Sequence, residues 1–427
     1  MKVDTFKLLN NFFDHKWKII FVFTIISFLL SFLFFEKRDL MSEYLVVNTL
    51  FLNDINSFQH WLGIFFYDGQ QYISQFGIQG FIFSIPIFIG IEPSSIYLLV
   101  LILFVSFLFY YLIVSSAIEI KLQYNSISAL LFLLIVFFNP LFLFNSGNLY
   151  WLYFIYILPF YFSLKYYNKI NNKLFYLLLS LIFLLKFLTN FEYSSTFVMS
   201  ATIPIILKLN FNFFIGLKKI LKELFLVFIS SVFSFTIAII LMISQLSYNG
   251  QKPILEVNKI IASYSAGADN KPHFLNYINK RVEWNTMYNP IFNNIDNPNQ
   301  KNGWDGVIKA RESYAGYKSI FKYVNFNTNR SIFYSLQFIF FCALSLLLLI
   351  YYLTRIKTKK ASLIILLLAI LSSLSWVLLM PLHFYLHSVY WSGISDVILI
   401  LPLYTTILIL LGIELNIYLK PINLLKK

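Results

Sequence analysis

Long uninterrupted stretches of apolar residues alternate along this chain with short polar connections rich in lysine. Crossing the roughly 30 Å hydrocarbon core of a bilayer takes about 20 helical residues, and about ten of these stretches approach that length. They are continuous, unlike the alternating apolar and polar positions of an outer-membrane barrel. The pattern predicts about ten transmembrane helices, over residues 17–35, 95–116, 127–144, 149–166, 173–189, 193–208, 224–247, 331–353, 362–380 and 396–414.

One further apolar run, residues 78–91, is shorter than the others and contains Pro86. A run of about 10–14 apolar residues is too short to cross a bilayer as a helix. We therefore expect residues 78–91 to form a re-entrant or interfacial segment.

The composition agrees with a membrane protein. The chain has 427 residues, of which 59% are hydrophobic and only 12% charged, whereas soluble domains carry about 25% charged residues. This excludes a soluble, a disordered and a disulfide-rich secreted protein. Cys342, the one cysteine, lies inside a predicted helix, so a disulfide within the chain and a cysteine metal site are excluded as well. The fold class expected is all-α, a polytopic membrane helical bundle.

Lysine and arginine indicate the orientation of this bundle. With the N-terminus on the cytoplasmic side, the cytoplasmic segments carry 19 basic residues, and the short outer loops carry two, Lys37 and Arg38. Basic residues mark cytoplasmic loops, so both termini are expected in the cytoplasm. Much of the net charge of +14 then faces anionic membrane lipids and does not indicate a nucleic-acid partner. The abundance of Ile, Asn, Lys and Phe favours a bacterial inner (plasma) membrane.

Two extracytoplasmic loop regions are too large to be simple connectors. They divide the chain into an N-terminal membrane module, 1–247, with the first loop at 36–77, then the large loop 248–330, and the C-terminal membrane helices 331–427. The sequence contains no Walker A and no Rossmann glycine pattern. We therefore expect the chemistry of the protein on the extracytoplasmic side.

Asp68 stands apart from the other acidic residues of the first loop because aromatic residues surround it in the sequence, among them Tyr67 and Tyr72. Burial beside aromatic rings raises the pKa of a carboxylate towards that of a useful general base. Asp-Gly is equally a common turn dipeptide. Both interpretations of Asp68-Gly69 stay open at this point.

The segment Tyr67-Asp68-Gly69-Gln70-Gln71-Tyr72, followed by Gly77 and by an apolar stretch that reaches Phe83 and Pro86, resembles the first-loop signature of GT-C glycosyltransferases. The resemblance covers about 20 residues and the topology. It departs from the family pattern in having Tyr67 where Trp is commoner, a single acid in place of an Asp-Glu pair, and Ile-Gln-Gly after Gly77 where an aromatic residue is usual.

The resemblance implies an enzyme that moves a sugar from a polyprenyl-phosphate carrier to a glycan, glycolipid or protein acceptor outside the cytoplasm. Asp68 matches the catalytic base of the family. It would take a proton from the acceptor hydroxyl while that hydroxyl attacks the anomeric carbon and polyprenyl phosphate leaves. This implies an inverting hexosyltransferase whose lipid-linked sugar is a co-substrate. The first loop has no Asp-x-Asp or other metal-ligand cluster, so we expect no metal and no cofactor.

A leaving phosphate needs positive charge or strong donors around it. Each residue that could supply them, or bind the substrate, also has a structural interpretation: snorkelling to the interface, helix-end pairing or simple solvation. The candidate phosphate- or substrate-binding residues are Lys186, Glu192, His383, His387, Arg281 and Arg311.

Aromatic residues crowd the predicted outer rim of the bundle. Tyr and Trp gather at membrane interfaces for physical reasons, and the same rings can stack on a sugar, with Asn145 and Asn148 close by to bond hydroxyls. The candidate sugar-stacking residues are Tyr72, Tyr150, Trp151 and Trp391.

Two other functions remain as alternatives. An O-antigen polymerase or ligase is also polytopic, with a large late outer loop and arginines at its site, and 248–330 fits that position. A polysaccharide or lipid flippase or another transporter is the second alternative. Transporters carry polar groups near the bilayer midplane, and apart from the region of Lys186 these apolar stretches have almost none.

Overall fold

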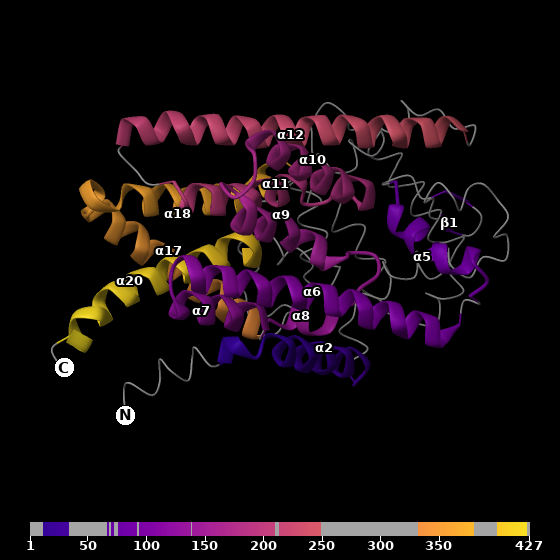
Figure 1. Ribbon diagram of the computed structural model, residues 1–427, viewed down its shortest axis with the longest axis horizontal. Helices are drawn as coiled ribbons and strands as arrows, with labels where there is room; N and C mark the ends of the chain where they lie inside the picture. The colour runs from indigo at the N-terminus through magenta and orange to yellow at the C-terminus, as the bar shows by residue number, and fades with distance from the viewer. Residues whose placement is uncertain are drawn as a thin grey trace.

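The computed structural model describes residues 12–33, 66–67, 70–71, 76–91, 94–137, 139–209, 213–248, 332–379 and 399–424. These residues are mostly helical (Figure 1). In chain order the helices are α2 (Lys16–Leu33), α5 (Ile78–Phe88), α6 (Ser95–Gln123), α7 (Ser126–Phe137), α8 (Pro140–Asn145), α9 (Tyr153–Tyr166), α10 (Asn172–Thr189), α11 (Ser194–Leu207), α12 (Phe213–Tyr248), α17 (Ile332–Thr354), α18 (Ile356–Leu379), the π-helix η4 (Leu399–Tyr404) and α20 (Thr405–Leu424).

Every apolar stretch predicted to be a transmembrane helix coincides with one or two of these helices. Five of the helices in the described part of the chain are long and apolar enough to cross a membrane, over Ile96–Gln123, Asn172–Thr189, Lys218–Ser247, Thr358–Ser375 and Leu399–Leu419. The expected all-α class is thus observed, and the chain has the helices of a membrane protein.

Two predicted stretches are interrupted where proline enters. Residues 127–144 form α7 and α8, because Pro140 has no N–H to continue the first helix and instead begins the second, whose first turn is capped by the Asn139 side chain (2.9 Å to the Leu141 N–H). The described part of the predicted stretch 396–414 begins at η4, which contains Pro402, before α20 follows. At Pro140, proline therefore sets a helix boundary that apolar character alone does not show.

The short segment around Pro86 forms α5, a helix of 11 residues. At 1.5 Å per residue α5 is roughly 16 Å long, about half of the hydrocarbon thickness. It lies beside β1 (Phe66–Tyr67) at one end of the molecule, away from the end where α2 begins and α20 ends (Figure 1). β1 pairs in antiparallel register with β2 (Gln70–Gln71).

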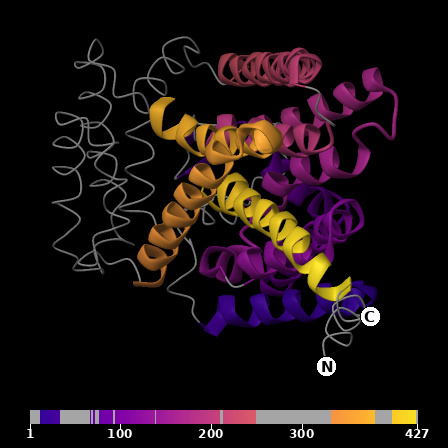
Figure 2. The ribbon, with the colours of Figure 1, turned by 90° about the vertical axis from the view of Figure 1, so that its left-hand side faces the viewer.

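The helices pack as a bundle with α12 and α2 on opposite edges (Figure 2). α6 packs against α2, α7 and α9, whereas α10 packs against α9 and α12. The outward face of α12 is strongly apolar, with Phe225, Phe228 and Phe233 exposed. Exposing an apolar surface of this kind to water is unfavourable, so this face of α12 is suited to contact with lipid.

Charged side chains of the described residues gather at the end of the bundle where α9 finishes and α10 begins. Lys169 pairs with Glu119 at 3.4 Å. Lys208 donates to the carbonyls of Ser163 and Tyr167 at 3.3 and 3.4 Å, so it satisfies the open carbonyl end of α9. At this end Lys208 therefore stabilises a helix terminus, and Lys169 forms an ion pair.

Small residues allow the close approach of two helices elsewhere in the bundle. A Cβ atom on Gly412 of α20 would lie 2.5 Å from the backbone Cα of Ser128 in α7. The Ser128 hydroxyl donates to the Ile409 carbonyl at 3.1 Å, which fixes the same contact. No room for a methyl group is left at Gly412.

We predict that Gly412→Ala destabilises the protein by about 1–3 kcal/mol, the usual cost of overpacking, since backbone must move to admit the new methyl group. Thermal unfolding of the purified protein in detergent measures this loss. Leu415→Ala, on the exposed side of the same helix, is the control and should change stability by less than about 0.5 kcal/mol. Equal unfolding temperatures for Gly412→Ala and the wild type would show that the two helices are further apart than described.

Candidate functional site

The last turn of α10 contains a lysine with no exposed surface. Lys186 is 0% exposed, and its ammonium has three N–H donors. These meet three oxygens of the residues that follow: the Asn190 carbonyl at 3.0 Å, the Asn190 side-chain Oδ1, and the Glu192 carbonyl at 2.9 Å. Lys186 thereby neutralises the carbonyl-rich end of its own helix and closes the chain into a fixed turn. We call residues 186–193 the Lys186 turn.

The ring of Tyr156 in α9 completes the surroundings of this ammonium. Lys186 Nζ lies 4.5 Å from the centre of the Tyr156 ring, a cation–π distance. The Tyr156 hydroxyl donates to Asn190 Oδ1 at 3.3 Å, so Tyr156 holds the turn from two sides. The Asn190 side chain is 1% exposed, and within the described chain its Nδ2 has no hydrogen-bond acceptor.

The turn ends at a tyrosine in an uncommon backbone conformation. Tyr193 has φ 57° and is fully buried. A bulky residue in the left-handed region carries strain of the order of 1–3 kcal/mol, and such a residue persists only where its surroundings hold it. Here the Tyr193 ring packs 6.1 Å from Trp151 and 6.5 Å from Tyr156, centre to centre.

A second turn, residues 146–152, faces the first one from the start of α9. The Asn148 side chain accepts the backbone N–H groups of Tyr150 and Trp151, both at 3.0 Å. Leu152, with φ 47°, then redirects the chain into α9. We call residues 146–152 the Asn148 turn. The two turns meet through Trp151 and Tyr193.

The aromatic residues predicted in this region are inside the protein. Trp151 is 1% exposed and Tyr150 is almost as buried. Their rings contact each other edge to face at 5.2 Å. Buried rings of this kind stabilise the two turns, and in the described conformation neither ring offers a free face to a sugar or to the membrane interface. Asn145 and Asn148 are likewise buried.

The chain that follows the Asp68 motif is bonded to both turns. The Gly77 N–H donates to the Leu188 carbonyl of the Lys186 turn at 3.0 Å. Gln79 Nε2 then lies 3.2 Å from the Tyr150 carbonyl and 3.4 Å from the Thr189 carbonyl. Gly77 has φ 78°, a conformation that favours glycine, as the residue before α5. The chain just after the Asp68 motif is therefore attached to the bundle at the Lys186 turn.

A cavity of about 170 Å³ lies next to these bonds, between α5, α6, α9 and α10. Its walls are apolar, among them Phe83, Phe104 and Leu185, apart from Gln79 and Thr189. The Gln79 side chain is fully buried, and its Oε1 has no donor within the described chain. An acceptor of this kind beside an apolar cavity can meet a hydroxyl or amine donor from outside.

The structure brings together four of the residues that the sequence singled out, Lys186, Glu192, Tyr150 and Trp151. Glu192 is nearly buried in the Lys186 turn. Seven other candidates fall outside the described residues: Asp68, Tyr72, Arg281, Arg311, His383, His387 and Trp391. Within the described ranges there is no group of His, Cys, Asp and Glu that could hold a metal ion.

Sequence reasoning missed Gln79, Asn190, Tyr156 and Tyr193. Gln79 is a polar residue inside an apolar run, and Asn190 lies between two candidate residues, so a search for isolated polar positions could have found both. Tyr156 and Tyr193 carry no such signal because tyrosine is abundant in this chain, with 29 residues. Their role depends on which rings the fold brings together at the Lys186 turn.

Comparison of the chain with models of protein families, with curated proteins and with solved structures finds no match.

We predict that Lys186→Met destabilises the protein by about 1–3 kcal/mol, because buried carbonyl oxygens of Asn190 and Glu192 lose their donor. The measurement is thermal unfolding in detergent. Lys173→Met, at the exposed start of the same helix, is the matched control and should leave stability within about 0.5 kcal/mol of the wild type. A Lys186→Met protein as stable as the control would mean that the ammonium does not hold the turn.

Proposed function

We propose that this chain is a multi-pass membrane glycosyltransferase of the GT-C type, which transfers a hexosyl group from a polyprenyl-phosphate carrier to a glycan, glycolipid or protein acceptor on the extracytoplasmic side. The proposal rests on the first-loop motif around Asp68 and on one structural observation. That observation is the bonding of Gly77 and Gln79, just after the motif, to the Lys186 and Asn148 turns.

This bonding supports the proposal because it joins the loop that carries a candidate base to a rigid, buried platform. A catalytic loop works best on elements that pack firmly. The platform here has a buried cation, buried amides and stacked rings, an unusual set for a bundle of apolar helices. Its position beside α5, the short helix of the Pro86 segment, agrees with a reaction near one membrane surface.

In the proposed reaction Asp68 accepts the proton of the acceptor hydroxyl as the hydroxyl oxygen bonds to the anomeric carbon. The bond from that carbon to the phosphate oxygen breaks on the opposite side, so the configuration inverts and polyprenyl phosphate leaves. The proposal involves no metal. Within it, Lys186 is a positioning residue, since its three donors hold the turn.

The remaining candidates have roles at the same site. Arg281, Arg311, His383 and His387 would bind the leaving phosphate, because a departing dianion needs strong donors. Glu192 would orient the acceptor. Tyr72 and Trp391 would stack on sugar rings.

For the membrane we propose about ten spans, both termini in the cytoplasm, 78–91 as a re-entrant or interfacial segment, and the inner membrane of a bacterium as the location. In support, α2 begins and α20 ends at the end of the bundle opposite to β1 and α5 (Figure 1). The ion pairs Lys169–Glu119 and Lys359–Glu414 belong to helix ends and connections assigned to the cytoplasmic side.

This topology predicts that green fluorescent protein fused after Lys427 fluoresces in bacteria, since it folds in the cytoplasm. Alkaline phosphatase, which needs an oxidising compartment, should be active when fused after Gln300 and inactive when fused after Lys360. The reverse pattern of the two phosphatase fusions would contradict the proposed orientation.

Replacing Asp68 tests the function. Asp68→Asn keeps the shape of the side chain and removes the base, so glycan transfer should fall about 10²–10⁴-fold. The measurement is the surface glycan profile of the native host by gel and mass spectrometry, with deletion and wild-type strains for comparison and membrane levels checked by blot. Asp54→Asn, in the same loop, is the matched control and should behave as wild type.

A normal glycan profile for Asp68→Asn at normal protein level would contradict Asp68 as the base. A deletion strain whose glycans are unchanged would contradict the glycosyltransferase proposal as a whole. Loss of glycan in both Asp68→Asn and Asp54→Asn would show that the loop, and not the carboxylate of Asp68, is what the reaction needs.

A further inference from the structure

At the other end of the α9–α10 pair from the Lys186 turn, two lysine ammonium groups lie over tyrosine rings. Lys16 Nζ, at the first residue of α2, is 4.4 Å from the centre of the Tyr111 ring of α6. Lys165 Nζ, in the last turn of α9, is 5.3 Å from the Tyr161 ring and 5.2 Å from the Tyr166 ring. Lys165 also donates to the Tyr161 hydroxyl at 2.8 Å.

The two lysines lie at the C-terminal part of α6, the helix that contains Tyr111. The Tyr111 ring stacks on Trp17, the neighbour of Lys16, at 5.9 Å between centres. At that end of α6, Gln123 donates to the Leu164 carbonyl, next to Lys165, at 2.7 Å, and Lys121 pairs with Asp14, two residues before Lys16, at 3.9 Å. We call Lys16, Trp17, Tyr111, Tyr161, Lys165 and Tyr166 the lysine–tyrosine patch. It draws on three helices, α2, α6 and α9.

Neither lysine of the patch has a counter-ion among the residues that the structure describes. Two carboxylates at this end of the bundle are already paired, Asp14 with Lys121 at 3.9 Å and Glu119 with Lys169 at 3.4 Å. The ammonium groups of Lys16 and Lys165 instead make cation–π contacts with aromatic rings. N–H donors of both ammonium groups therefore remain for an anion.

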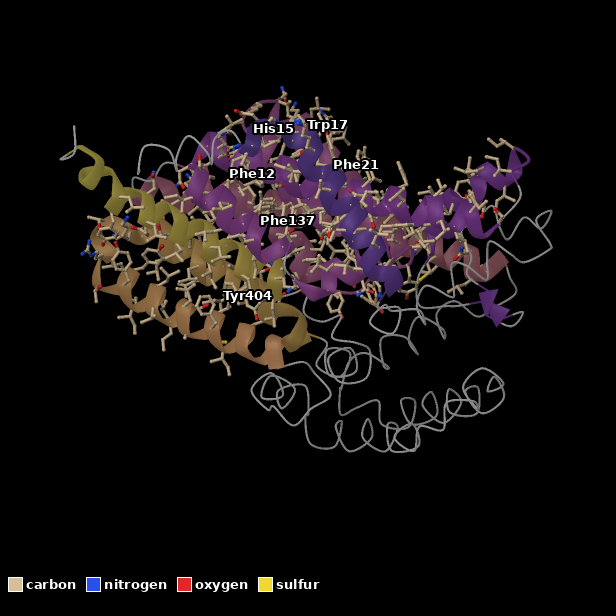
Figure 3. The ribbon with its side chains drawn as sticks, turned by 90° about the horizontal axis from the view of Figure 1, so that it is seen from below. Phe12, His15, Trp17, Phe21, Phe137 and Tyr404 are labelled. Carbon is tan, nitrogen blue, oxygen red and sulfur yellow. The ribbon has the colours of Figure 1, made fainter. Side chains whose placement is uncertain are left out.

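The patch lies where apolar surface meets the polar end of the bundle. Trp17 is 62% exposed and Phe21, one turn further along α2, is 65% exposed. Figure 3 shows both residues along α2. An exposed Trp beside lysine, with Tyr rings next to it, is typical of the level of lipid headgroups in a bilayer. An anion at this level, with an apolar surface just beneath it, is a phospholipid.

We propose that the lysine–tyrosine patch binds the phosphate group of an anionic phospholipid, whose acyl chains lie along the exposed face of α2. Lys16 and Lys165 contact the phosphate oxygens from two sides, and Trp17 packs against the glycerol region. The site is separate from the proposed glycosyl transfer, which would take place at the opposite end of the bundle. A phospholipid bound at this site would hold α2 and α9 together, two helices that are far apart in the sequence.

The test uses the full chain purified in detergent and native mass spectrometry with phosphatidylglycerol as the probe and phosphatidylcholine as the zwitterionic comparison. We expect phosphatidylglycerol to bind more tightly, and the binding to weaken as salt rises. Each lysine near the surface contributes about fivefold to the affinity, so Lys16→Gln with Lys165→Gln should weaken binding about 30-fold. Lys16→Arg with Lys165→Arg keeps the charge and should keep binding.

Lys18→Gln with Lys173→Gln removes the same charge from exposed positions outside the patch and is the matched control. An equal loss of binding in this control would overturn the proposal, because net charge and not the patch would then attract the lipid. Equal retention of phosphatidylcholine and phosphatidylglycerol by the wild type would overturn it too. Inorganic phosphate that competes fully with phosphatidylglycerol at millimolar concentration would assign the site to a free anion instead of a lipid.

Discussion

The fully buried ammonium of Lys186 is the interaction on which the arrangement of this site depends. A charge inside a helical bundle is tolerated only where every donor has a partner, and here the partners are oxygens of the next six residues of the chain. The lysine therefore dictates the course of the turn between α10 and α11. Tyr193, Trp151 and Tyr156 then pack around that turn.

The same turn anchors the chain just before and in α5. The carbonyls of Leu188 and Thr189 are open because they lie at the end of α10, and they accept from Gly77 and from Gln79. The Gly77 N–H and the Gln79 side chain thus join the end of α10, α5 and the second turn at Tyr150 through bonds to backbone carbonyls. In this way Gly77 and Gln79, the residues that follow the Asp68 motif, gain a fixed connection to the bundle.

The lysines at the two ends of the bundle have different kinds of partner. At one end Lys186 is buried and binds oxygens of its own chain. At the other end Lys208 serves the carbonyl end of α9, Lys169 and Lys359 pair with acids, and Lys16 and Lys165 lie on tyrosine rings. A buried ammonium group needs oxygen partners within the protein. A lysine near a membrane surface can instead keep N–H donors for lipid or water.

The sequence by itself determined the helical class, the positions of the apolar helices and the shortness of the Pro86 segment, because length and apolar continuity directly reflect the thickness of a bilayer. It also singled out Lys186, since a charge in an apolar run stands out. Only the tertiary structure decided what Lys186 binds, that Trp151 is buried and that Gln79 and Asn190 belong to the same site. Those facts depend on contacts between residues far apart in the chain, such as Gln79 with Tyr150 and Tyr156 with Asn190, which no local pattern contains.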